Sequence, residues 1–205
     1  AIANNFKLWK STGKFGTRGY VFDIGQTTAQ AIDRITDDTP YASSAHTFAS
    51  GNGSIMRVAP AIAANFNNPA RAIGEAVALS LITHGNSDTI TYISAFTDEV
   101  IRGTKNPVNK LLRHYDVYQT YNTGSIMHSY NVAHLAAHYG SGFEGALMEA
   151  AKLGYDTDTN CAVTGMLVGS YMGYESIPKR FLKDLQQHDM LLDMANKMYD
   201  IGARG

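Results

Sequence analysis

Apolar residues recur at spacings of three and four along most of the chain, and Gly or Pro marks the breaks between these stretches. This spacing is that of one face of an α-helix. Stretches in which apolar and polar residues alternate are scarce. The pattern predicts helices over residues 29–35, 55–66, 69–84, 88–102, 108–115, 128–139, 142–153, 161–174 and 178–201. We therefore expect a compact all-α protein, with one domain over residues 1–205.

Three glycines, Gly165, Gly169 and Gly173, recur every four residues in the predicted helix 161–174. Each glycine costs about 1 kcal/mol in helix propensity, but it lets a neighbouring helix approach closely. We expect this helix to be central. At the other end of the chain, Phe6 and Trp9 are typical of the last turns of an apolar helix.

The charges nearly balance, with 17 Lys and Arg against 18 Asp and Glu, and no run of like charge. This balance argues against a nucleic-acid or membrane surface as partner and favours a small molecule or a local protein patch. Cys161 is the single cysteine, which excludes an internal disulfide framework. No apolar run is long enough to span a membrane. We expect a soluble, cytoplasmic monomer.

A turn at residues 154–160, here called the acidic turn, places two carboxylates and a hydroxyl directly before a predicted helix. The oxygen atoms of Asp156, Asp158 and Thr159 are the ligands that hard cations such as Mg²⁺ or Mn²⁺ prefer. The alternative is structural, because Asp158 could cap the helix and Asp156 could favour its positive end.

Asp23 stands between apolar residues and a Gly turn before a predicted helix. Partial burial of such an acid would raise its pKa towards the range useful in acid–base catalysis. The alternative is a turn or capping role. A second acidic group, residues 36–39 (Thr-Asp-Asp-Thr), could serve a two-metal site or lie in a solvated loop.

Residues 50–54 (Ser-Gly-Asn-Gly-Ser), here called the glycine loop, open a predicted helix. Their backbone N–H groups could hold an anion such as a diphosphate, or provide only a turn and a cap. His84 ends another predicted helix, where the dipole favours a cation. His134 and His138 lie four residues apart without the Glu of a zinc protease motif, and we interpret them as ordinary helix-face histidines.

Taken together and in order, several motifs resemble the ADP-ribosylglycohydrolase family. They are Trp9, residues 23–28 (DIGQTT), residues 50–60 (SGNGSIMRVAP), residues 83–84 (TH), residues 124–125 (GS) and residues 153–160 (LGYDTDTN). The resemblance covers nearly the whole chain. It implies an all-α fold, two bound Mg²⁺ ions, with Mn²⁺ as a substitute, and removal of ADP-ribose from modified side chains or small acceptors. The implied partner is ADP-ribose or an ADP-ribosylated protein.

The resemblance also implies roles for individual residues. Asp156, Asp158 and Thr159 match metal ligands, and Asp23 matches an acid beside the scissile ribose, where an oxocarbenium-like transition state would form. The residues implied in substrate binding are Gly51, Asn52, Gly53, Ser54, Met56, His84, Gly124, Ser125 and Tyr155.

The chain departs from the family pattern at two places. Tyr155 stands where the family usually has Gly, so its ring is expected to narrow the groove or to stack in it. The Thr-Asp-Asp block that supplies the other metal ligands lies upstream of Trp9 in the family, and residues 36–39 follow Asp23 instead. We therefore expect a chain without the family's N-terminal segment. It is either a fragment of the hydrolase or a catalytically degenerate ADP-ribose-binding relative, and an unrelated Mg²⁺ phosphohydrolase is the third alternative.

Overall fold

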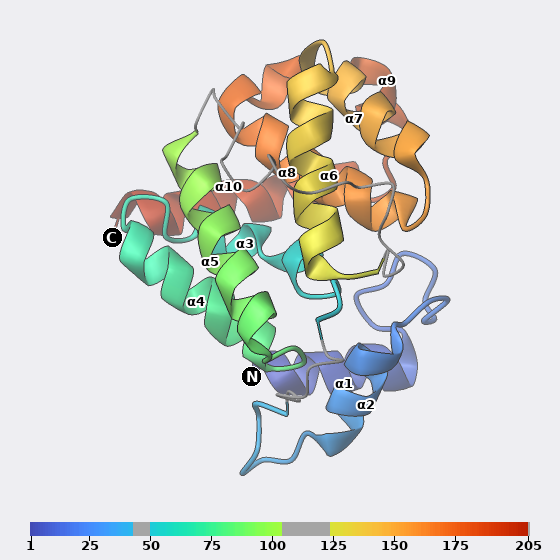
Figure 1. Ribbon diagram of the computed structural model, residues 1–205. Coiled ribbons are helices and arrows are strands. Elements are labelled where there is room, and N and C mark those ends of the chain that lie inside the picture. Colours follow the sequence, from blue (N-terminus) through green and yellow to red (C-terminus); the bar gives the residue numbers. More distant parts are fainter. Residues whose placement is uncertain (43–49, 104–123, 205) are drawn as a thin grey trace.

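The computed structural model describes residues 1–42, 50–103 and 124–204, and these contain ten α-helices and no strand (Figure 1). The predicted all-α class is therefore confirmed. The helices are α1 (Ile2–Thr12), α2 (Gln26–Arg34), α3 (Ala59–Ala63), α4 (Pro69–Leu81), α5 (Ser87–Arg102), α6 (Ile126–Tyr139), α7 (Gly142–Leu153), α8 (Thr157–Met172), α9 (Lys179–Asp184) and α10 (His188–Arg204). Two short 3₁₀ helices, η1 (Ile55–Arg57) and η4 (Tyr174–Ser176), precede α3 and α9.

Two predicted helices are divided in the structure. The range 55–66 becomes η1 and α3, because Pro60 lacks an N–H group and lies in the first turn of a new helix. The range 178–201 becomes α9 and α10, with Leu185 extended and Gln187 at φ 60° between them. Helix α8 begins at Thr157, four residues before the prediction, so half of the acidic turn is helical. The predicted helix 108–115 lies outside the described residues.

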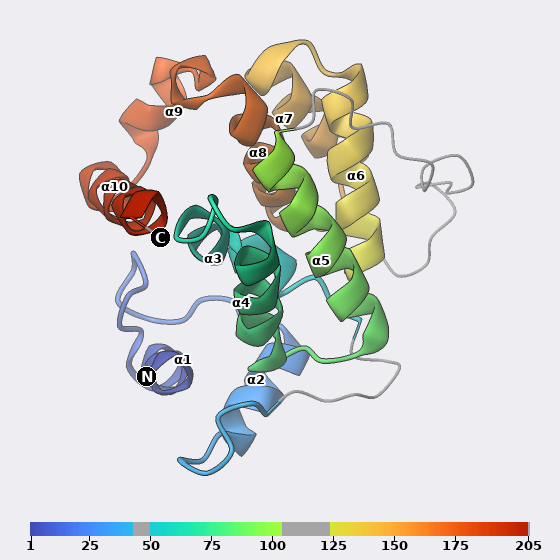
Figure 2. The same cartoon turned by 90° about the vertical axis from the view of Figure 1, so that its left-hand side faces the viewer.

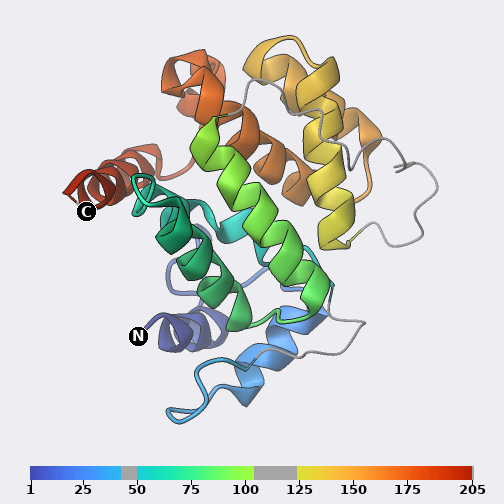
Figure 3. The same cartoon turned by 60° about the vertical axis from the view of Figure 1, so that its left-hand side comes forward.

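Helices α3 to α6 and α8 surround the main hydrophobic core (Figures 1 and 3). Phe96 of α5 and Tyr130 of α6 are fully buried there, with their ring centroids 6.5 Å apart. Leu167 of α8 closes the core from the other side. Because α8 packs against α5, α6 and α7, its predicted central position is confirmed.

The glycines of α8 at positions 165 and 169 are not needed for the close approach of a neighbouring helix. A methyl group at Gly165 or Gly169 would meet the nearest side chain at 3.7 Å, an ordinary contact distance. Gly173 has φ 79° and ends the helix, which is the usual role of a glycine at that place. The predicted reason for the repeat is therefore wrong at Gly165 and Gly169.

Helices α1 and α2 form a second cluster below the main core (Figure 2). Ala3 of α1 packs with Ile32 and Ile35 at the end of α2, and Ile82 after α4 joins them. Phe6 and Trp9, which predicted an apolar helix end, cover this cluster. The loops that end the larger bundle therefore face the α1–α2 unit.

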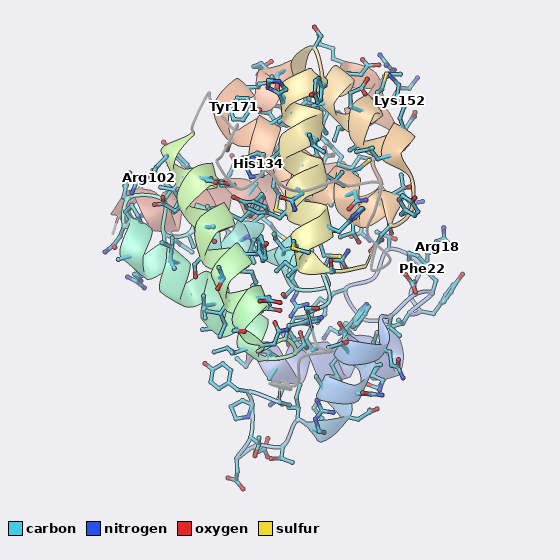
Figure 4. All side chains as sticks on the ribbon, in the orientation of Figure 1. Arg18, Phe22, Arg102, His134, Lys152 and Tyr171 are labelled. Carbon is cyan, nitrogen blue, oxygen red and sulfur yellow. The ribbon has the colours of Figure 1, made fainter. Side chains whose placement is uncertain are left out.

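His134 is a core residue, labelled in Figure 4, and its Nε2 lies 2.9 Å from a carboxylate oxygen of Glu99 on α5. It has a structural role, as expected, while His138 is exposed at the end of α6. None of the described helices combines the length and the apolar character that crossing a membrane requires.

Candidate active site

A cavity of about 780 Å³ lies between the α1–α2 unit and the loops of the larger bundle. Its wall includes residues from α1, the segment before α2, the first turn of α2, the glycine loop, the turn after α4 and the start of α8. Most of the site residues expected from the sequence line it, namely Asp23, Gly51, Asn52, Gly53, Met56, His84, Gly124, Asp156, Asp158 and Thr159. Residues more than 130 positions apart are thus brought to one cavity.

Three expected substrate-binding residues are not part of the cavity wall. Ser54 is fully buried, and its Oγ has no hydrogen-bond partner among the described residues. Ser125 caps α6, where its Oγ accepts a hydrogen bond from the backbone N–H of His128 at 3.2 Å. Tyr155 is 62% exposed and its ring meets the edge of His128, so it does not stack in the cavity as expected.

The acidic turn owes its shape to a glycine and to the amide of Asn160. Gly154 ends α7 at φ 72° and ψ −145°, a region that residues with a side chain rarely adopt. Asn160 donates its backbone N–H to the Asp156 carbonyl at 2.9 Å and its side-chain amide to the Gly154 carbonyl at 3.4 Å. Asp156 occupies the N-cap position of α8, but its side chain makes no capping hydrogen bond. Asp158, which was expected as the cap, lies in the first turn of α8 and not at the cap position, so the capping alternative is wrong for Asp158.

Asp156 is held by the glycine loop instead. The side-chain amide of Asn52 donates to the Asp156 carboxylate at 2.6 Å and to Ser129 Oγ at 2.9 Å. Asn52 was expected to bind substrate, yet both of its amide hydrogens are used within the protein. No pattern in the sequence links Asn52 to Asp156, because 104 positions separate them.

The donor set at the acidic turn has the chemistry of a magnesium site. Asp156, Asp158 and Thr159 all line the cavity. Within the residues that the structure describes, no group of three or more His, Cys, Asp or Glu side chains could hold a metal. Two carboxylates and a hydroxyl nevertheless fit one Mg²⁺, since this ion commonly binds one or two carboxylates and completes its shell with water and phosphate oxygens.

The second acidic group, residues 36–39, does not reach this site. Asp37 and Asp38 are exposed and absent from the cavity wall. Thr36 Oγ1 accepts the backbone N–H of Thr39 at 3.0 Å, which makes the segment a solvated turn. The described residues therefore bring one of the two acidic groups, and not both, to the cavity.

The glycine loop precedes the three-residue η1, so it does not have the helix N-terminus that was expected to hold an anion. Gly51 and Gly53 of the loop lie so close to His84 that a side chain at either position would be crowded. A Cβ atom at Gly51 would lie 3.3 Å from His84 Nε2, and one at Gly53 would lie 3.1 Å from His84 Cε1. The loop is fixed to the start of α6 by backbone hydrogen bonds from Asn52 to Gly124 at 3.0 Å and from Ile126 to Ser50 at 2.8 Å.

His84 is 1% exposed, and burial together with the nearby charge of Arg57 lowers its pKa from 6.5 to about 4. The ring is therefore neutral at pH 7, contrary to the cationic role that the helix end suggested. Its Nδ1 lies 2.7 Å from Thr83 Oγ1. Arg57 donates to that same oxygen at 2.5 Å and also to the Gly53 carbonyl.

Burial lowers the pKa of Arg57 to about 10, so Arg57 remains a cation at neutral pH. Its Nε is enclosed without a partner among the described residues, and its guanidinium carbon lies 5.0 Å from the ring centre of Phe6. The site roles of Arg57 and Thr83 were missed at the sequence level, although both stand inside the motifs that carried the resemblance.

Asp23 lies on the exposed rim of the cavity, so the burial that its apolar neighbours predicted is not found. The next residue towards the N-terminus, Phe22, also lines the cavity and is 66% exposed. The Arg18 guanidinium lies 4.5 Å from the centre of its ring, and Figure 4 shows this pair on the outer side of the segment between α1 and α2. Asp23 therefore faces solvent on one side and the cavity on the other.

Comparison with known proteins finds a family, relatives and a solved structure that are similar to the chain. The model of the ADP-ribosylglycohydrolase family matches residues 1–204. The chain is 24% identical to the ADP-ribosylarginine hydrolase Tri1 of Serratia proteamaculans, over 93% of this chain and 58% of the relative. It is 27% identical to the ADP-ribosyl-[dinitrogen reductase] glycohydrolase of Rhodospirillum rubrum, over 90% of this chain and 65% of that protein.

A solved structure, an ADP-ribosylglycohydrolase-related protein complex, superposes with a TM-score of 0.76 and 25% identity, over 87% of this chain and 69% of that one. The chain thus spans about three-fifths of the length of the curated relatives that it matches. The match to the family model extends over almost every residue, and the chain therefore belongs to the ADP-ribosylglycohydrolase family.

Proposed function

We propose that the protein takes part in the magnesium-dependent hydrolysis of the bond between ADP-ribose and a modified side chain. The observation that carries the proposal is the cavity, which gathers an acid, a glycine loop, a neutral histidine and a hard-cation donor set from distant parts of the chain. The names of the two relatives, both hydrolases of ADP-ribosylated proteins or arginine, support it. ADP-ribose or an ADP-ribosylated protein would be the partner.

The residues of the cavity suit a nucleoside diphosphate sugar. Arg57 contributes a positive charge at the cavity wall, which favours an anionic diphosphate. Gly51 and Gly53 carry no side chain, which leaves room for the neutral His84 ring beside the cavity. Asp156, Asp158 and Thr159 would hold the magnesium ion. That ion would supply positive charge beside the ribose and diphosphate oxygens.

Asp23 would act at the acceptor side of the bond. Its carboxylate lies on the cavity rim, where a modified side chain from another protein would enter. There it could accept a proton from the attacking water as positive charge develops on the ribose. This role needs an exposed carboxylate within reach of the anomeric carbon, and it does not need the burial expected from the sequence.

A release assay tests the proposal. The protein is incubated with a peptide that carries ADP-ribosylated arginine, with Mg²⁺, with Mn²⁺ or with EDTA, and free ADP-ribose is measured. We expect release with either cation and none with EDTA. The Asp23→Asn variant should lose most of the rate while it keeps its affinity for ADP-ribose, because an acid–base group acts mainly in the transition state. Equal loss of both would make Asp23 a binding residue.

A binding protein without turnover is the second candidate. It is favoured by the single-cation donor set among the described residues, since the family resemblance implies two ions. In that case ADP-ribose would bind, as measured by calorimetry, and no release would occur with any cation. Hydrolysis of a simple phosphate ester without release of ADP-ribose would instead indicate a phosphohydrolase.

A further inference from the structure

Three polar groups, two of which line the cavity, form a chain of contacts. Arg57 Nη2 donates to Thr83 Oγ1 at 2.5 Å, and Thr83 Oγ1 lies 2.7 Å from His84 Nδ1. Thr83 is fully buried and His84 is 1% exposed. The direction of each hydrogen bond can be assigned from the number of donors and acceptors that each group has.

Arg57 can only donate, because a guanidinium has no acceptor. It therefore occupies one lone pair of Thr83 Oγ1 and leaves the hydroxyl hydrogen of Thr83 in need of an acceptor. Among the described residues the only acceptor that the structure places near this hydroxyl is His84 Nδ1. If Nδ1 carried the proton instead, the buried hydroxyl hydrogen of Thr83 would have no partner, which is costly.

The imidazole is neutral, so a proton that is absent from Nδ1 must be on Nε2. Nε2 faces the part of the cavity wall formed by Gly51 and Gly53, where a Cβ atom would lie 3.3 Å from it at either position. His84 itself lines the cavity, and within the described part of the chain Nε2 has no hydrogen-bond partner. A fixed N–H donor therefore lies at the cavity wall beside the glycine loop.

We propose that Arg57 and Thr83 are positioning residues that hold His84 as the Nε2–H tautomer, so that its ring donates a hydrogen bond to an oxygen of the bound ligand. The identity of that ligand as ADP-ribose rests on the proposed function. The same Arg57 donates to the Gly53 carbonyl, so one cation sets both the histidine tautomer and the position of the glycine loop. A phosphate or hydroxyl oxygen accepts from Nε2, while a donor at that point of the ligand is rejected.

The tautomer is measured directly by ¹⁵N NMR of the histidine rings in the unliganded protein at pH 7.5, with His84 assigned from the missing signals of His84→Gln. We expect a protonated Nε2 and an unprotonated Nδ1 in the wild type and in Thr83→Ser. Thr83→Val, which removes the hydroxyl at nearly constant volume, should show a mixture of tautomers. A protonated Nδ1 in the wild type, or the wild-type pattern in Thr83→Val, overturns the proposal.

Binding of ADP-ribose is then measured by calorimetry. Thr83→Val should bind about tenfold more weakly than the wild type, the loss expected for one hydrogen bond, and Thr83→Ser should restore the affinity. Equal affinity of the Val and Ser variants would contradict the ligand contact. A wild type that does not bind ADP-ribose would overturn both the proposed function and this contact, whereas the NMR pattern decides the tautomer independently.

Discussion

His84 lies between the glycine loop and Thr83, and both its burial and the Arg57 charge keep it neutral. Its pKa falls from 6.5 in the unfolded chain to about 4 in the folded protein. The unfolded chain therefore takes up a proton below pH 6.5 that the folded protein takes up only near pH 4. The contribution of the neutral His84 ring to the free energy of unfolding is therefore complete above pH 6.5 and is lost as the pH falls from 6.5 to 4.

We expect this loss to amount to about 3 kcal/mol in the free energy of unfolding, the value that corresponds to the pKa difference. Urea unfolding at pH 7, 6, 5 and 4 measures it. His84→Gln should flatten the decline, while His138→Gln, which changes an exposed histidine, should leave it as in the wild type. The same decline in all three proteins would show that other groups cause it.

Gly53 and Gly74 give a matched pair for testing the close approach of the glycine loop to His84. A Cβ at Gly53 would lie 3.2 Å from Thr28 Oγ1 and 3.1 Å from His84 Cε1, and one at Gly74 in α4 would meet nothing within 4 Å. Gly53→Ala should destabilise the protein by about 1–3 kcal/mol, and Gly74→Ala should stabilise it by about 0.5–1 kcal/mol. Denaturant unfolding compares them, and a stabilising Gly53→Ala would contradict the packing described.

At the scale of elements, the glycine loop connects the start of α6 to the acidic turn through Asn52. Asn52→Ala removes the amide that orients Asp156, so Mg²⁺ should bind about 10–100-fold more weakly. Isothermal titration with Mg²⁺ measures the affinity. Asn67→Ala, which removes an amide bonded to Gly202 far along the chain, serves as the control. An unchanged Mg²⁺ affinity in Asn52→Ala would show that Asn52 does not orient Asp156 for metal binding.

Asp158 in the first turn of α8 either binds the metal or only stabilises the helix, and the effect of Mg²⁺ on the Asp158→Ala variant distinguishes the two roles. Asp158 is exposed, lines the cavity and makes no described hydrogen bond, so its loss should cost less than about 1 kcal/mol without metal. With Mg²⁺ the melting temperature of the wild type should rise, and the rise should vanish in Asp158→Ala. A mutant that is destabilised equally with and without Mg²⁺ would show that Asp158 stabilises the helix dipole and is not a metal ligand.

For the whole molecule, the helical class could be predicted because the apolar spacing is local. The break between α9 and α10 could not, since Leu185 and Gln187 are neither Gly nor Pro, the residues that usually mark a break in the sequence. The acidic turn and the glycine loop were recognisable as motifs. Their contacts were not, because Asn52 and Asp156, like Arg57 and Thr83, meet only after folding.

The burial of Asp23 was predicted wrongly for a related reason. Apolar neighbours in sequence indicate burial only where the segment packs, and Phe22 beside Asp23 is itself exposed. The turn at residues 36–39 had the composition of a metal site, yet composition does not place a turn at a cavity. The position of residues 36–39 after Asp23, in the wrong order for the family pattern, was the better guide to their absence from the cavity.

The α1–α2 unit has its own apolar cluster and supplies one side of the cavity, so a ligand in the cavity would touch two separately packed parts. Bound ligand should make local detachment of the α1–α2 unit less favourable, because detachment of α1 and α2 would release the ligand. In hydrogen–deuterium exchange, ADP-ribose at 100 times its dissociation constant should slow the amides of α1 and α2 by up to about 100-fold. The amides of α10, which lies outside the cavity wall, should exchange at an unchanged rate. Equal slowing in both regions would mean that the α1–α2 unit opens only when the whole protein unfolds.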